Sequence, residues 1–279
     1  MTDRLFQRQG RLLVTKKAGG RNVASSSGGM VFNTRLTFAI ASDLSSFSNK
    51  SSIKIYNLST KSQAFLEQDN LLAILQVGYL DQGFNTIFIG DIDRENGIHT
   101  QRVGPDVVTD IECGDAETEI NNAVVSLSYK GRVTTNQIIN RLLGALNLSI
   151  GFRDRLPNKT FENGYSNSGR IQYIMNDLAR KVGFTWSVQN GQIVILRPNR
   201  TITQTAFVVS KDTGLFGAIV KTKEKVEFTV LITPEIRVGR AVRLITDQYG
   251  TMDLKINKVN YNGDTHEGEW SQQIEGQPI

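Results

Sequence analysis

The chain has 279 residues and a mass of 31.0 kDa, and its 39% hydrophobic and 21% charged residues are typical of a globular protein. One cysteine and two histidines exclude an intramolecular disulfide and a cysteine-based zinc site, and no run reaches the roughly 18 apolar residues of a membrane span. The first 24 residues carry six basic residues against one acidic residue, and the rest has 26 of each sign, so the net charge of +5 comes from this segment.

The basic N-terminal segment has two interpretations. It could be an arm for nucleic acid or an acidic partner, or a solvated strand that happens to be basic. No aromatic residues interleave with the basic ones, and the run Leu12, Leu13 and Val14 is typical of a strand, so the strand is favoured. No apolar stretch suggests a signal peptide. The basic residues are Arg4, Arg8, Arg11, Lys16, Lys17 and Arg21.

Residues 1–115 show the pattern of a β-meander or small barrel. Residues 19–29 are rich in glycine and serine and predict a loop. Ser59 is a good N-cap for a short helix over residues 60–68. Alternating apolar residues and turn signals predict strands over residues 30–40, 50–58, 71–79, 86–91 and 107–113.

The pattern changes after Asp115, and residues 116–198 predict two small strand–helix–strand units. A strand over residues 124–129 precedes a helix that Thr134 or Thr135 caps, with an apolar stripe at 134–146, and a strand over 147–152 follows. A second helix, with its stripe at 170–182, ends at Gly183. Residues 184–196 form a hairpin, since Asn190–Gly191 is a type I′ turn signal.

Residues 199–279 return to strand patterns, over residues 225–232, 240–246, 253–261 and 270–275, separated by glycine-containing turns. We therefore expect a mainly β, α+β fold in which two small β-barrels flank an α/β middle. The expected domains are residues 1–115, 116–198 and 199–279.

Two segments could suggest metal binding, and both are better explained as turns. Residues 91–97 resemble the start of a calcium loop, but Gly97 falls at position seven, and Arg102 stands where a bidentate glutamate is needed. Residues 263–270 (GDTHEGEW) gather one histidine, His266, with three carboxylates but lack metal-ligand spacing. We expect a charged turn and a polar hairpin loop that ends in Trp270.

No residue receives a catalytic, cofactor-binding or metal-ligating role. Cys113 ends a β run and has no fixed histidine partner, so it is expected to be a small buried residue, and no nucleophile-elbow, dinucleotide or phosphate-loop motif occurs. A carboxylate pair suited to glycoside cleavage forms in space rather than in sequence, so that alternative stays open. The function is expected to lie in shape and assembly.

An ordered set of short motifs resembles the baseplate (tail) hub proteins of contractile-tailed bacteriophages and related prophages. The resemblance covers about residues 30–275 and includes a C-terminal run that ends in Gly263-Asp264 and Trp270. The motifs are residues 53–58 (IKIYNL), 77–79 (VGY), 87–92 (IFIGDI), 106–115 (DVVTDIECGD), 213–217 (TGLFG), 226–228 (VEF), 231–236 (LITPEI) and 259–270.

The resemblance implies a structural virion protein, not an enzyme. Such hubs form a homotrimer that adapts a six-fold tail tube to a three-fold central spike. Two alike barrels per chain would make the trimer a pseudo-hexamer, closed by heterologous contacts. The implied partners are a tail-tube or tube-initiator protein, the central spike and baseplate wedge proteins, with no cofactor, membrane span or specific nucleic-acid binding. The implied location is the phage tail baseplate, after synthesis in the cytoplasm of the host bacterium.

The loop at residues 19–29 and the helix stripes at 134–146 and 170–182 are candidate contact features, and the middle region is where spike or wedge partners would differ. We expect the basic N-terminus to face outward or contact an acidic neighbour, and deletion of residues 1–24 to weaken assembly more than folding. The alternatives are a tail-associated cell-wall hydrolase, a nucleic-acid-binding protein and a ring-forming secretion component.

Overall fold

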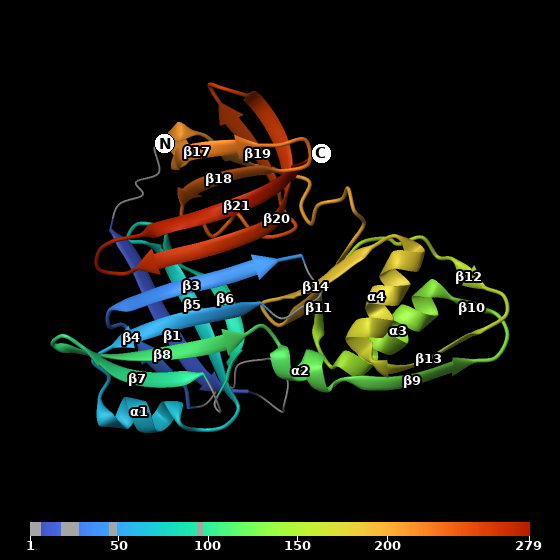
Figure 1. Ribbon diagram of the computed structural model, residues 1–279, viewed down its shortest axis with the longest axis horizontal. Coiled ribbons are helices and arrows are strands. Elements are labelled where there is room, and N and C mark those ends of the chain that lie inside the picture. The colour runs from blue at the N-terminus through green and yellow to red at the C-terminus, as the bar shows by residue number, and fades with distance from the viewer. Residues whose placement is uncertain (1–6, 18–27, 45–48, 94–96) are drawn as a thin grey trace.

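The computed structural model describes residues 7–17, 28–44, 49–93 and 97–279 and is mainly β, with a few helices (Figure 1). The expected mainly β, α+β class is confirmed. Strands from the N-terminal and C-terminal parts of the chain form one body, and the middle unit, from α2 to β15, projects from its side (Figure 1). In the part that the structure describes, no helix has the length and apolar character needed to cross a membrane.

The elements follow one another in three groups. The first group comprises β1 (Arg8–Lys16), β2 (Met30–Phe32), β3 (Leu36–Asp43), β4 (Lys50–Tyr56), α1 (Thr60–Leu66), β5 (Leu71–Tyr79), β6 (Gly83–Ile92), β7 (Ile98–Val103) and β8 (Asp106–Gly114). The middle unit comprises α2 (Glu117–Asn122), β9 (Val124–Tyr129), β10 (Val133–Thr134), α3 (Thr135–Leu146), β11 (Ser149–Arg153), β12 (Thr160–Phe161), β13 (Tyr165–Arg170), α4 (Ile171–Val182), β14 (Thr185–Gln189) and β15 (Gln192–Leu196). The last group comprises β16 (Phe207–Val209), the 3-10 turn η1 (Lys211–Thr213), β17 (Leu215–Lys221), β18 (Val226–Leu231), β19 (Ala241–Thr246), β20 (Gly250–Asp264) and β21 (Trp270–Pro278).

Two separate barrels were expected, and the described strands of the body instead form one 14-stranded sheet. The reason is the length of β20. Its first half pairs with β19, and its second half pairs with β3 from Lys258 opposite Asp43 to Asp264 opposite Thr37. Strand β20 therefore joins the strands of the N-terminal and C-terminal parts of the chain into one sheet.

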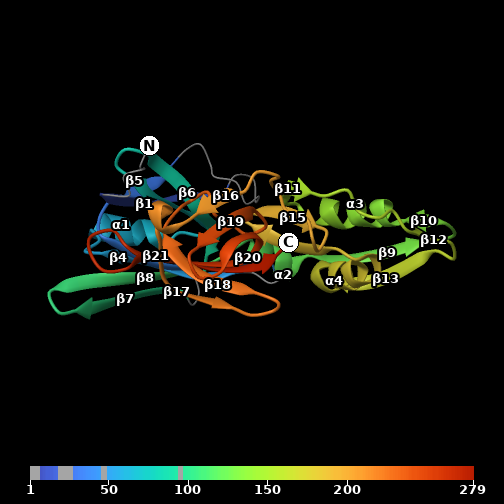
Figure 2. The ribbon, with the colours of Figure 1, turned by 90° about the horizontal axis from the view of Figure 1, so that it is seen from above.

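Within this sheet, eight strands run side by side in the order β17-β18-β21-β20-β3-β4-β8-β7, and every neighbouring pair is antiparallel. We call this set the eight-stranded layer. Strands β6, β5, β1 and β2 continue from β8 and lie behind the layer, and β19 and β16 continue from β20 (Figure 2).

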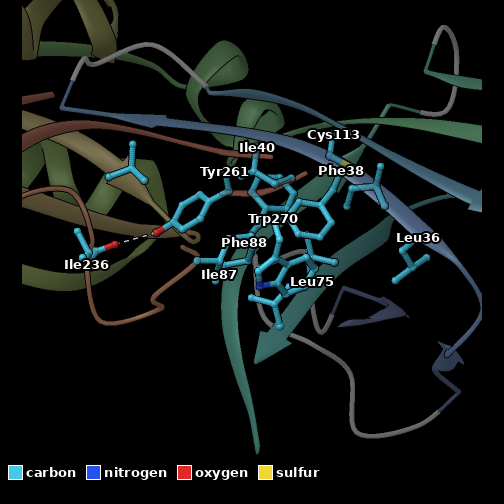
Figure 3. Packing of buried hydrophobic residues seen from close by; sticks show 14 of the residues in the cluster. Leu36, Phe38, Ile40, Leu75, Ile87, Phe88, Cys113, Ile236, Tyr261 and Trp270 are labelled. Carbon is cyan, nitrogen blue, oxygen red and sulfur yellow. Dashed lines mark hydrogen bonds between the residues drawn. The ribbon is translucent and has the colours of Figure 1, made fainter. Parts of the chain in front are cut away.

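A single hydrophobic cluster joins the two ends of the chain inside the body. Phe38 of β3 packs edge-on against Trp270 of β21, with ring centroids 5.7 Å apart, and Figure 3 shows side chains of both chain ends in contact there. The Tyr79 hydroxyl donates to the Ile232 carbonyl at 3.0 Å and accepts from the Trp270 indole N–H at 3.2 Å. The buried polar groups of these two aromatic residues are therefore satisfied across the chain ends.

Several glycines in the sequence motifs are required by close packing. A Cβ on Gly78 would overlap the Gly83 carbonyl in the β5–β6 hairpin, and one on Gly263 would overlap the Phe38 ring. These motifs therefore reflect how β5 and β20 pack in the body.

The middle unit has its own hydrophobic cluster, formed mainly by one face of α3 and one face of α4. Thr134 caps α3 with a capping box to Gln137, and Gly183 ends α4 with φ +90°. Asn190 and Gly191 both have positive φ, so the expected turn between β14 and β15 is present. The sheet β11-β15-β14 and the ribbon β9-β13 complete the unit. The division at residues 115 and 198 stays a prediction.

Most local predictions agree with the structure, including the Ser59 cap of α1. The predicted strand over residues 30–40 is broken into β2 and β3 at residues 33–35. The sequence patterns did not predict α2, β7, β10, β12, β13, β16 or β17, which are short or lack regular alternation.

Candidate functional site

The eight-stranded layer has one face on the body core and one face free of it, which we call the outer face. On β18, Val226, Phe228 and Val230 are buried, whereas Glu227 and Thr229 between them are half-exposed. Alternation of this kind places successive side chains on opposite faces of a sheet. The register extends the outer face across the layer through Glu227, Thr229, Gln273, Glu275, Lys258, Asn260, Asn262, Ala39, Ser52, Lys54, Asp110 and Glu112.

Charges of opposite sign stand next to each other on the outer face. Lys258 lies opposite Glu275 across β20 and β21, and Lys54 lies opposite Asp110 across β4 and β8, with a 3.6 Å ion pair. The Ser52 hydroxyl also donates to Asp110 at 2.7 Å. Opposite charges directly across a sheet stabilise strand pairing modestly. From β18 to β8, the outer face is thus polar without an excess of basic charge, whereas β17 adds the apolar residues Phe216 and Val220 at its end.

Lys225, at the start of β18, pairs with two carboxylates. Its Nζ lies 2.6 Å from Glu227 and 3.0 Å from Glu275. These contacts, with Glu227 as the larger cause, raise the pKa of Lys225 to about 12. Lys225 is half-exposed, so solvent screens these pairs and they contribute little to the stability of the fold.

Open hollows follow the outer face from strand to strand. One lies between Ala218, Glu227, Lys258 and Gln273. A second lies between Thr37, Lys54 and Asn262, and a third between Ala39, Ser52 and Glu112. None has a convergent set of catalytic groups, which fits a surface for contact better than a reaction site.

A buried polar junction attaches the middle unit to the body. Asp115, only 4% exposed, accepts the backbone N–H groups of Asn190 and Gly191, each at 2.8 Å. The amide of Gln189 donates to the Asp43 carbonyl at 2.5 Å, and the Asn190 side chain accepts from the Ile89 N–H at 3.0 Å. The β14–β15 turn is therefore held by three separate strands or strand ends of the body.

Three of the four described basic residues of the N-terminus, Arg8, Arg11 and Lys17, make contacts within the chain, and Lys16 is exposed. Arg11 donates to Gln76 at 2.7 Å and lies over the Phe84 ring, and Arg8 donates to the Gly268 carbonyl at 3.0 Å. Lys17 is buried, with Nζ 2.7 Å from Asp91 of β6 and 3.0 Å from Glu119 of α2. The acidic neighbour expected for this segment is thus part of the same chain; Arg4 and Arg21 lie outside the described residues.

The structure overturns the expectation that residues 1–24 affect assembly more than folding. Strand β1 pairs with nine residues of β5, and Leu12 and Val14 lie fully buried in the body core. Deleting this strand would remove core side chains and uncover the edge of β5, so the deletion would damage the fold itself.

The helix stripes proposed as contact features are also corrected. The apolar residues of both stripes, such as Ile138, Leu142, Ile174 and Leu178, are buried in the core of the middle unit and so cannot meet a partner. Amphipathic helices bury their apolar face in this way by default. Most of the loop at residues 19–29 lies outside the described residues.

Of the two segments weighed for metal binding, residues 91–97 are described only in part, and residues 263–270 form a turn. Asp91 pairs with Lys17, and residues 94–96 lie outside the described part. One carboxylate oxygen of Asp264 lies 2.7 Å from the Arg35 guanidinium, and the other accepts a hydrogen bond from the backbone N–H of His266 at 2.8 Å. Residues 264–267 are therefore a hydrogen-bonded turn. Burial opposes ionisation of Asp264, but the Arg35 and backbone hydrogen bonds hold its pKa below the usual value. Among the described residues, no three His, Cys, Asp or Glu side chains are grouped to hold a metal ion.

Cys113 is buried in the body core, as expected, and burial raises the pKa of its thiol. The nucleophilic thiolate is therefore disfavoured. His99 is exposed on β7, opposite Asp110, whereas the Cys113 thiol is buried in the core.

Sequence reasoning found six of the eight strands of the layer, all except β7 and β17, but missed the outer face itself. The alternation in residues 226–231 and 253–261 was the available signal, since it separates polar from apolar positions. Asp115 was part of a recognised motif, and its acceptor role toward residues 190–191 depends on a contact 75 residues away.

Comparison with known proteins agrees with this geometry. The model of a family described as baseplate hub gp41 matches residues 26–248. The 43 kDa tail protein of prophage MuSo2 from Shewanella oneidensis is 11% identical, with a TM-score of 0.64 over 96% of this chain and 98% of that chain. A tail protein from Neisseria meningitidis MC58 is 12% identical, with a TM-score of 0.62 over 98% and 96%.

A third similar structure is the E. coli c3393 protein, 9% identical, with a TM-score of 0.59 over 88% of this chain and 74% of that chain. No curated protein matches the chain in sequence. The structural likenesses show the fold alone, whereas the family match spans most of the chain. The chain belongs to the baseplate hub gp41 family, whose members are structural proteins of the phage tail baseplate.

Proposed function

We propose that three copies of the chain form a ring around the tail axis that joins the hexameric tail tube to the trimeric central spike. The observation that carries this proposal is the continuous polar outer face, built from both ends of one chain. Family membership supports a structural role in the baseplate. The trimeric ring and its contacts with the spike and the tube go beyond family membership and are the content of this proposal.

The eight-stranded layer divides into two equal halves at the β20–β3 pairing. Four strands, β17, β18, β21 and β20, come from the C-terminal part, and four, β3, β4, β8 and β7, come from the N-terminal part. Three copies would present six four-stranded halves. A three-fold ring with six similar sheets can stack on a six-fold tube at one end and a three-fold spike at the other.

The outer face suits the wall of a channel for DNA. Its lysines stand opposite carboxylates, and the small residues Ala39 and Ser52 lie between them. A wall rich in unpaired lysine and arginine would bind phosphates and retard a moving genome. We therefore place the outer face toward the channel and the strands behind it toward the outside of the ring.

The partners follow from the same arrangement: a tail-tube or tube-initiator protein, a central spike, and wedge proteins around the ring. The E. coli c3393 protein is described as a component of the type VI secretion system with structural similarity to the T4 tail proteins gp27 and gp5, and its similar fold supports partners of the tail-protein kind for this chain. The family match supports the phage tail as the location of this chain.

We propose no enzymatic role. The alternative of a cell-wall hydrolase is tested by a zymogram on peptidoglycan with the purified chain. A cleared band at 31.0 kDa would overturn the purely structural role.

Electron microscopy of the purified protein in negative stain tests the ring. Projection averages should show a three-fold particle with a stain-filled centre and six inner lobes. Solid particles without a central opening, or rings of another symmetry, would contradict the proposal.

A further inference from the structure

The middle unit carries an excess of basic residues. Residues 116–198 hold ten basic and five acidic residues. Four of the acidic residues are already engaged in ion pairs: Glu119, Asp154, Glu162 and Asp177. Because these carboxylates are engaged, the exposed arginines and lysines of the unit are left to attract an acidic partner.

Arg153 is a positive charge fixed at the place where β11 packs beside α3. Its Nη1 donates to the side-chain oxygen of Asn140 at 2.5 Å, and its Nη2 donates to that of Asn136 at 3.0 Å. Both acceptors are neutral amides. Burial lowers the pKa of Arg153, and no carboxylate of the described residues opposes this change, yet a guanidinium stays charged at neutral pH. The two asparagines therefore hold a half-exposed cation in one position, without a counter-charge.

The side of α3 next to this charge is open. Asn136, Asn140 and Gly144 are spaced four residues apart and so lie on one face of the helix. A Cβ at Gly144 would have no neighbouring atom within 4 Å. Arg141 on α3 and Arg155 after β11 are exposed, and they add two positive charges near Arg153 in the chain.

Strand β11 has a free edge beside the same helix. It ends the three-stranded sheet β11-β15-β14, and its other edge has no strand partner among the described residues. The first three residues of β11 are exposed, with Ile150 49% exposed. Ile150 and Arg153 lie opposite two isoleucines of β15 that belong to the cluster of the middle unit, so both point to the side of the sheet that α3 covers (Figure 2).

We infer that this face binds an extended acidic segment of another protein, which adds a strand to the free edge of β11. We call the face the α3–β11 face: Asn136, Asn140 and Gly144 on α3, with Ile150 and Arg153 on β11. The segment places a carboxylate on Arg153 and an apolar side chain on Ile150. In such complexes the main-chain hydrogen bonds provide affinity and the side-chain contacts provide specificity. The inference rests on the proposed role in assembly and names the chemistry of one partner, and it does not depend on the ring.

A protein segment fits the α3–β11 face better than a nucleic acid does. The unpaired N–H and C=O groups of an edge strand match the groups of another polypeptide backbone, whereas a phosphate backbone has no N–H to donate. Ile150 gains from an apolar side chain and gains nothing from a phosphate.

Binding of a labelled peptide to the full-length chain tests the site. The probe is a twelve-residue peptide, labelled with fluorescein, in which glutamate alternates with valine or threonine. Its fluorescence anisotropy should rise to saturation as the chain is added, and added salt should weaken the binding by screening the charges. A peptide with lysine in place of glutamate should not bind. Equal binding of the two peptides, or no saturable binding of the acidic one, would contradict the inference.

Variants on the two helices locate the charge that matters. Gly144→Glu places a carboxylate in open space on the α3–β11 face and should weaken binding of the acidic peptide roughly tenfold. Arg153→Gln, which removes the fixed charge, should weaken it similarly. The matched control Tyr173→Glu adds the same negative charge at an exposed position of α4 and should leave the affinity almost unchanged. Equal weakening by Gly144→Glu and Tyr173→Glu would show attraction to the net charge of the unit, and the site would be wrong.

Hydrogen exchange tests the added strand. At saturation, the acidic peptide should slow exchange in residues 149–153 and leave residues 185–189 of β14, at the other edge of the sheet, unchanged. Protection of residues 185–189 alone would overturn the inference. Displacement of the peptide by an equal concentration of duplex DNA would make the face a phosphate site and would overturn it as well.

Light scattering on the same samples separates this site from the ring. A trimer that does not bind the acidic peptide would keep the ring and remove the site. A monomer that binds the peptide, and loses this binding in Gly144→Glu, would keep the site and remove the ring.

Discussion

Asp115 links the two hydrophobic clusters of the molecule. It follows β8 in the body and accepts two backbone N–H groups from the β14–β15 turn of the middle unit. Burial raises its pKa to about 7, against the two hydrogen bonds, which lower it, and with Asp91 and Glu119 nearby adding to the rise. The carboxyl group therefore gains a proton in the folded state where it would be ionised in the unfolded chain.

The stability of the protein should depend on pH through this group. The folded-state pKa lies above the ordinary value of 3.8, so the contribution is complete below pH 4 and is lost as the pH rises through about 7. Between pH 5 and 8, the parent should lose about 2–3 kcal/mol of unfolding free energy relative to Asp115→Asn, which does not titrate.

Urea unfolding at several pH values measures this difference, with Asp212→Asn as the control because Asp212 is an exposed carboxylate. A constant difference between the parent and Asp115→Asn from pH 5 to 8 would show that Asp115 is ionised throughout.

Tyr79 makes the corresponding contact inside the body. Tyr79→Phe would leave the Ile232 carbonyl and the Trp270 indole N–H buried without this hydroxyl. An unmade buried hydrogen bond costs about 1–3 kcal/mol, so urea unfolding should show a loss of that size. Tyr173→Phe, at an exposed ring, should change stability by less than about 0.5 kcal/mol. Equal stability of the two variants would mean that Tyr79 contributes only its ring.

At the scale of elements, the middle unit owes its packing to α3 and α4. We propose that it unfolds separately from the body, because its apolar residues cluster apart from those of the body. Leu142→Ala, at a fully buried position of α3, should cost about 2–5 kcal/mol. Hydrogen exchange should then speed up across residues 124–196 while the β20–β3 pairing stays protected.

Ile256→Ala in the body core is the matched change and should give the reverse exchange pattern. Uniform acceleration over the whole chain in both variants would show a single cooperative unit and would remove the proposed boundaries at residues 115 and 198.

The sequence predicted elements well where the signal is local. The caps Ser59 and Thr134, the terminating Gly183 and the Asn190–Gly191 turn each act within a few residues. The pairing of β20 with β3 joins residues more than 200 positions apart, and no local pattern reports it. This pairing is why one open sheet replaced the two expected barrels.

The same limit applies to the site. Strand alternation could show that Glu227 and Lys258 point away from a core, but only the register shows that they share one face with Lys54 and Asp110. The helix stripes could be read from sequence as either contact surface or core, and burial in the middle unit decides for core. Likewise, only the pairing of β1 with β5 and the ion pair of Lys17 with Asp91 show that the basic N-terminal segment is part of the body.

At the scale of the whole molecule, one chain supplies two four-stranded halves and a polar outer face, and among the described residues the strands at the two ends of the layer have no further strand partner. Free strand edges are normally protected in soluble proteins. A ring in which each copy covers the edges of its neighbours would protect all of them at once, and the middle units would project from it as separate contact surfaces.

The most direct test of this account is the mass of the purified protein in solution, measured by light scattering after size exclusion over a range of concentrations. The account predicts a species of three times 31.0 kDa that persists on dilution. A mass that stays at 31.0 kDa at the highest concentration, or a stable dimer or tetramer, would contradict a ring that the chain closes by itself.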